Sequence, residues 1–160
     1  MKQGSTLFLK AALILIAIPV LALCIFAVPE IGNFAVELYP DSPYLKYLVL
    51  IDLYATAVPF YIALYQSFKL LGYIDKSNAF SDLSVQALKK IKYCAITFSG
   101  LYVLGMPLLY LIAERDDAPG IIVIGMVLIF ASLVIAVFAA VLQRLLKEAI
   151  DIKSENDLTV

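Results

Sequence analysis

Four long apolar stretches, almost free of charge, divide this chain of 160 residues. A helix rises 1.5 Å per residue, so about 20 residues cross the hydrocarbon of a bilayer, and each stretch is near that length. Inside them stands one acidic residue, Asp52. Helices satisfy their own backbone polar groups, as lipid demands. The pattern predicts an all-α, polytopic membrane protein with four spans, at about 8–28, 47–69, 93–113 and 118–142.

The composition supports lipid as the solvent of these stretches. Hydrophobic residues make up 63% of the chain and charged residues 16%, whereas soluble domains are about 45–50% apolar and about 25% charged. A chain this short leaves much of its surface exposed, so it has no room to hide the excess in a water-soluble core. We therefore expect contact with the lipid bilayer over one membrane domain, residues 1–160.

The basic residues predict the orientation, because Lys and Arg in short loops stay on the cytoplasmic side. Two lie near the N-terminus, five in or beside a loop at 70–92, and three in a tail at 143–160, whereas Lys46 and Arg115 alone lie in the other two loops. The split places both termini and the 70–92 loop in the cytoplasm, with the protein in the cell membrane.

Within that loop, residues 82–92 read as an amphipathic helix that continues into the third span. Leu83, Ala87 and Leu88 lie on one stripe. Lys89, Lys90 and Lys92 lie mostly off it. Two interpretations stay open, a solvated helical extension and a docking face for lipid headgroups or a partner.

The last three residues, Leu158, Thr159 and Val160, also leave two interpretations open. They could be a frayed terminus, or a C-terminal carboxylate that a partner captures.

One face of the second span carries the candidate polar site. Asp52, Thr56 and Gln66 share it. Carboxylates inside membranes usually face the protein interior or water and mark ion or proton pathways. The competing interpretation is that Asp52, about 9 Å from the centre of its span, simply reaches interfacial water.

The sequence offers no chemistry for an enzyme. There is no His, which removes the commonest general base and the commonest metal ligand. Cys24 and Cys94 are too few for a four-ligand zinc site. We expect no catalytic, cofactor-binding or metal-binding residues, and the net charge of −1 argues against direct nucleic-acid binding.

A lipoprotein cleavage site before Cys24 is a further alternative. Leu23 is larger than such sites prefer, and the apolar run continues to Val28. These two features favour an uncleaved first span.

Several short stretches spread along the chain resemble a family of small bacterial four-span membrane proteins that carries a domain-of-unknown-function label. They are Val58-Pro59-Phe60, Tyr73-Ile74-Asp75, Ala79-Phe80-Ser81, Leu88-Lys89-Lys90-Ile91, residues 116–120 and residues 153–160. Members are often encoded beside a small Cro/CI-type helix-turn-helix regulator. The resemblance implies no catalytic residue, and by analogy it implies a membrane partner of a transcription regulator.

Three functions are compatible with these observations. The first is a non-enzymatic regulatory or scaffolding protein that holds such a regulator through residues 72–92 and 147–160. The second is a small transporter or channel, with a homo-oligomer as one option, that uses Asp52, Thr56 and Gln66. The third is an immunity or membrane-stress protein.

Overall fold

A computed structural model describes the backbone of residues 3–159 and the side chains of residues 4–158. The described chain is helical almost throughout and contains no strand. Its elements are α1 (Gln3–Ala22), a π-helical turn η1 (Leu23–Ala27), α2 (Val28–Leu38), α3 (Tyr44–Asp75), α4 (Asp82–Asp116) and α5 (Gly120–Thr159). Four helical segments are long and apolar enough to cross a membrane, and α1, η1 and α2 together form the first. The all-α, four-span class is confirmed.

The first helical segment continues past residue 28, where the predicted span ends, to Leu38. Pro29 lacks an N–H, and the helix accommodates it through η1, in which the Val28 N–H reaches back to the Leu23 carbonyl. The helix ends at Leu38 because Tyr39 precedes Pro40, and a residue before proline disfavours the α conformation.

Helix α4 contains both the predicted amphipathic segment and the third span, without a break. Six residues connect it to α3, with Ser77 in the left-handed region at φ 61°. At its other end, Asp117 adopts φ 52° and ends the helix, and its N–H caps the Ala113 carbonyl.

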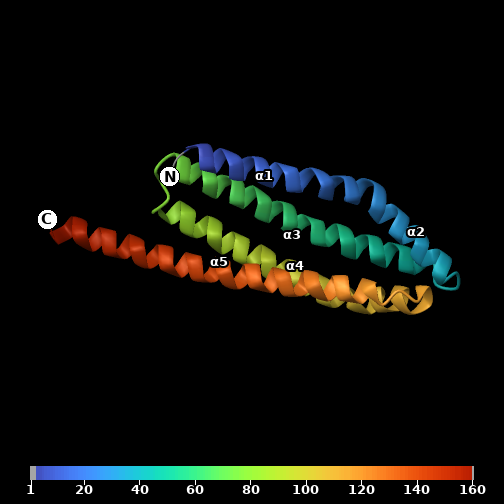
Figure 1. The fold of residues 1–160 in the computed structure, drawn as a ribbon. Coiled ribbons are helices and arrows are strands. Elements are labelled where there is room, and N and C mark those ends of the chain that lie inside the picture. The colour runs from blue at the N-terminus through green and yellow to red at the C-terminus, as the bar shows by residue number, and fades with distance from the viewer. Residues whose placement is uncertain (1–2, 160) are drawn as a thin grey trace.

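The helices stand side by side in the order α1, α3, α4, α5, as Figure 1 shows. The main packing pairs are α1 with α3, α3 with α4, and α4 with α5, so the arrangement is an open row rather than a closed bundle. Both ends of the described chain lie at one end of the row (Figure 1), here called the N/C end. The opposite end, with the 39–43 and 117–119 turns, is called the distal end.

One buried hydrophobic cluster, called the distal core, lies near the distal end, where α2 leans across α3 to reach α4 (Figure 1). Ala35, Val49 and Ile112 form its buried centre. Side chains from α2, α3, α4 and α5 surround it, namely Phe34, Leu38, Leu53, Leu108 and Ile121. The distal core therefore ties four helices together at this end, and buried side chains such as Thr6, Ser84 and Leu88 show that the helices also pack toward the N/C end.

Most of the apolar surface of the helices faces outward. Only 6–22% of the most apolar window of each span is buried inside the protein. Large side chains such as Phe8 and Leu104 are about three-quarters exposed, at 74% and 76%. An apolar surface of this extent needs lipid rather than water around it.

Candidate functional site

The carboxylate of Asp52 lies between α3 and α4, in the half of the row nearer the distal end. It packs directly against Gly105 of α4. A Cβ atom at Gly105 would lie 2.8 Å from the Asp52 Cγ, too close for any real side chain. Asp52 is half-buried, and it makes no hydrogen bond or ion pair with another residue in the described part of the chain.

A cavity of about 270 Å³ opens beside this carboxylate. Its walls come from α2, α3, α4 and α5, and Asp52 is the one titratable side chain among them. The other lining residues are apolar: Ile31, Phe34, Val49, Leu53, Gly105, Leu108, Leu109, Ile112 and Ile121. The arrangement is a hydrocarbon-walled pocket with one carboxyl group in its wall.

A second hollow, of about 350 Å³, lies on the outer side of α2. Glu30, Asn33 and Glu37 line it, together with Ile31 and Phe34. Ile31 and Phe34 also line the Asp52 cavity, so the hollow and the cavity are neighbours that share part of a wall.

Thr56 lies one turn along α3 from Asp52 and is buried. Its hydroxyl donates to the Leu53 carbonyl, with an oxygen–oxygen distance of 2.7 Å. Tyr102 of α4 lies near both Thr56 and Asp52. Tyr102 did not emerge from the sequence, because an aromatic residue in an uncharged span looks like any other packing residue.

Gln66 does not join this group. It is buried on the same face of α3 as Thr56 and Pro59, so this face turns toward the protein. Ten residues separate Gln66 from Thr56, however, which is about 15 Å along a helix. The structure thus brings Asp52 and Thr56 together and leaves Gln66 apart from both.

Two tyrosines of α3 fasten the first helical segment. The Tyr54 hydroxyl donates to the Cys24 carbonyl at 2.9 Å, and the Tyr61 hydroxyl donates to the Ala17 carbonyl at 2.8 Å. Both hydroxyls therefore bind main-chain carbonyls of the first helical segment.

The Tyr54 bond has a particular cause. In a regular α-helix the Cys24 carbonyl would accept the Val28 N–H, but in η1 that N–H goes to Leu23. The next residue, Pro29, has no N–H. The hydroxyl of Tyr54 therefore satisfies a carbonyl that the helix itself leaves without its usual donor.

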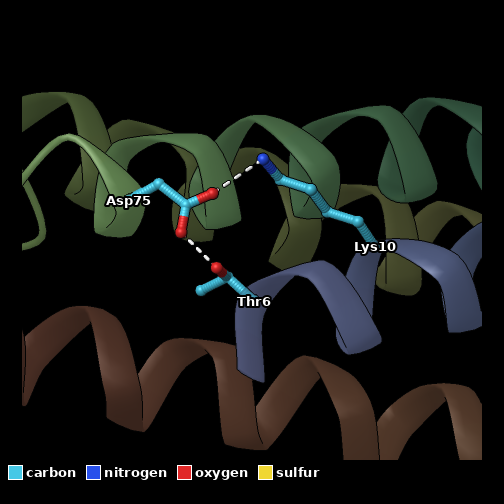
Figure 2. Close-up of polar contacts among 3 residues, drawn as sticks. All are labelled: Thr6, Lys10 and Asp75. Carbon is cyan, nitrogen blue, oxygen red and sulfur yellow. Dashed lines mark hydrogen bonds and ion pairs between the residues drawn. The ribbon is translucent and has the colours of Figure 1, made fainter. Parts of the chain in front are cut away.

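At the N/C end, the Asp75 carboxylate binds two side chains of α1, as Figure 2 shows. One oxygen accepts a hydrogen bond from the buried Thr6 hydroxyl. The other pairs with Lys10 Nζ at 2.9 Å. Asp75 lies beyond the predicted second span, and the Thr6 hydrogen bond, followed by that of Lys10, lowers its pKa below the ordinary aspartate value.

At the distal end, Tyr39 joins the α2–α3 turn to α4. Its hydroxyl donates to the Leu111 carbonyl at 2.8 Å. The guanidinium of Arg115 lies over its ring, 4.5 Å from the centroid. Arg115, one of the two basic residues at this end, is therefore held against the Tyr39 ring.

The predicted partner surface is partly occupied by the protein itself. Ala87 and Leu88 are buried by neighbouring helices, whereas Leu83 is exposed. Lys89 and Lys90 are exposed as well.

The remaining members of that surface differ among themselves. Lys92 is half-buried and its Nζ lies 4.7 Å from the Tyr93 ring centroid. Leu158 is 84% exposed, the Thr159 side chain is not described, and Val160 lies outside the described residues.

Three comparisons bear on identity. The family described as protein of unknown function (DUF2975) matches residues 30–160 of the chain. The chain belongs to this family. The match begins within α2 and includes every helix that contributes to the distal core.

A curated relative from Bacillus subtilis (strain 168), the uncharacterized membrane protein YoaS, is 71% identical over 160 residues and covers all of both chains. No solved structure matches. The resemblance inferred from the sequence is thereby confirmed at the level of the family, and the chain is an integral membrane protein of unknown molecular function.

Proposed function

We propose that this protein is a non-enzymatic scaffold that holds a soluble cytoplasmic protein at the membrane through the C-terminal part of α5. The resemblance noted above points to a small helix-turn-helix regulator as that protein. The orientation belongs to the same proposal. Ten of the twelve basic residues belong, by sequence, to the N-terminal segment, to the 70–92 loop and its flanks, or to the C-terminal tail, and the positive-inside rule assigns these parts to the cytoplasm.

The observation that carries the proposal is the length of α5. The helix has 40 residues, about twice what the hydrocarbon of a bilayer needs. Every described side chain from residue 151 to residue 158 is exposed. The end of α5 projects beyond the other helices at the N/C end (Figure 1). A helix in this position offers a binding face without rearrangement of the membrane domain.

The C-terminal part of α5 has an apolar edge. Leu145 and Ile152 are 55% and 60% exposed. Seven residues apart, they lie on the same face of the helix, which is the spacing that a partner helix can engage. Fewer residues of the 82–92 segment are free to contact a partner than the sequence predicted, because Ala87 and Leu88 are already buried inside the protein. Lys89 and Lys90 are the exposed part of that segment that could add charge to the contact.

The test is direct binding to the full-length protein in lipid nanodiscs. The ligand is the helix-turn-helix regulator encoded nearest to this chain in its genome, purified and titrated in biolayer interferometry. We expect saturable binding that Ile152→Asp weakens at least tenfold, because burying an isoleucine contributes about 1.5–3 kcal/mol.

The matched control is Ser154→Asp, which adds the same charge on the opposite face of α5 and should leave binding unchanged. Absence of binding to the unmodified protein, or equal losses in both variants, would refute the scaffold role.

A further inference from the structure

We propose that the cavity beside Asp52 binds an amphipathic organic monocation, an ammonium group that carries an apolar body. This inference concerns the distal half of the protein and does not depend on the scaffold function proposed for α5.

The first step is the uncompensated charge. Placing a carboxylate within a span is expensive, and such groups are normally paired. The described residues form two ion pairs, Lys10 with Asp75 and Arg144 with Glu148, and neither involves Asp52. Arg115, a basic residue of the distal end, lies over Tyr39 instead. A cation from outside the chain would supply the pairing that the chain itself does not.

The second step excludes a metal ion. Calcium takes six to eight oxygen ligands, and magnesium requires a near-ideal octahedron. Among the described residues no group of three His, Cys, Asp or Glu side chains is placed to hold a metal. One carboxylate in a hydrocarbon wall is a poor ligand set for a metal.

The third step is the fit to an organic cation. The remaining lining of the cavity is aliphatic except for Phe34. Apolar walls favour an apolar body, and the face of an aromatic ring attracts a cation. At about 270 Å³ the cavity is slightly smaller than common ligand pockets. A small aromatic or alkyl ammonium would satisfy both the charge and the walls.

The fourth step is the charge near the cavity. Glu30 and Glu37 line the neighbouring hollow, whose wall shares Ile31 and Phe34 with the cavity. A surface that carries negative groups raises the local concentration of cations. These two carboxylates therefore favour cations on the side of the protein where the cavity lies.

Gly105 makes the site possible. Its missing side chain leaves the space that the Asp52 carboxylate occupies between α3 and α4. Any larger residue there would displace the carboxylate, so Gly105 is a positioning residue for the charge.

The test uses the full chain in nanodiscs, with benzyltrimethylammonium as the probe and isothermal titration calorimetry as the readout. Neopentylbenzene, its neutral analogue of the same shape, reports binding by apolar contact alone. We expect saturable binding of the cation and only linear partitioning of the neutral analogue.

Asp52→Asn keeps the size of the side chain and removes the charge, and it should weaken cation binding at least tenfold. The matched control is Asp82→Asn, an exposed acid at the N/C end that should leave binding unchanged. Gly105→Ala keeps the carboxylate but displaces it and should also weaken binding. Gly105→Ala moves the carboxylate without removing it, so it provides an independent test if Asp52→Asn fails to fold.

Several results would overturn the proposal. They are equal affinity in Asp52→Asn and the unmodified chain, saturable binding of neopentylbenzene with similar affinity, or complete displacement of the probe by equimolar calcium.

Discussion

Single side chains at the ends of the row decide how the peripheral first helix is held. Helix α1 packs mainly on α3, and its N-terminal part is fixed there by the Asp75 carboxylate through Thr6 and Lys10 (Figure 2). The ionised form of Asp75 accepts both bonds, which is the physical reason for its lowered pKa. Attachment of α1 at this end therefore depends on the protonation of one group.

The first prediction concerns this group and pH. A carboxyl whose pKa is lower in the folded state stabilises that state above its unfolded pKa, about 3.9, and this contribution is lost as pH falls through the folded value. At neutral pH, Asp75→Asn should lower the thermal stability of the protein in detergent micelles. The difference from the unmodified chain should shrink as the pH is taken below about 4.

Asp82→Asn, also at the N/C end but exposed, is the control and should change stability little at any pH. A stability difference for Asp75→Asn that stays constant down to the acid range would show that the ionised carboxylate is not what holds α1.

At the scale of elements, the π-helical turn determines the course of the first helical segment. It ends two residues before Pro29, and α2, which follows it, carries Phe34 and Ala35 to the distal core. Tyr54 is linked to this turn because its hydroxyl binds the Cys24 carbonyl. The sequence shows the proline but not the turn, since an ordinary proline kink would have left the same pattern of residues.

The second prediction compares the two tyrosines that bind this segment. Tyr54→Phe leaves the Cys24 carbonyl without its donor, whereas Tyr61→Phe removes a bond to Ala17, whose carbonyl can still accept the Leu21 N–H. We expect Tyr54→Phe to lower the free energy of unfolding by about 1 kcal/mol, and Tyr61→Phe to lower it by less. Unfolding in mixed micelles measures both.

Tyr65→Phe is the matched control for these variants. Tyr65 is 61% exposed, and its ring can still pair with Lys69 after the hydroxyl is removed. If Tyr61→Phe proved the more damaging change, the explanation of the Tyr54 bond through the π-helical turn would be wrong.

At the scale of the whole molecule, the sequence predicted the number and class of the helices but not their arrangement. Uncharged runs of about 20 residues identify membrane helices because lipid selects them by length and polarity. The same runs carry almost no charge that could specify which helix lies next to which. The open row, the distal core and the meeting of Asp52 with Gly105 depend on packing between apolar surfaces, and this left no distinctive signal in the sequence. Asp52 itself was found because a charge within a span is conspicuous, whereas Tyr102 and Gly105 were not.

The third prediction concerns the placement of the row in the membrane. Both ends of the described chain lie at one end of the row (Figure 1), as four crossings require. The basic residues gather near that end, so it should face the cytoplasm.

Single cysteines, introduced in a background in which Cys24 and Cys94 are replaced by alanine, can test this orientation by their reaction with a membrane-impermeant maleimide. Asp41→Cys, in the distal turn, should react in intact cells. Ser77→Cys and Ser154→Cys, at the N/C end, should react only after lysis. Labelling of Ser154→Cys in intact cells would show that the orientation is the opposite one, and it would rule out binding of a cytoplasmic partner to α5.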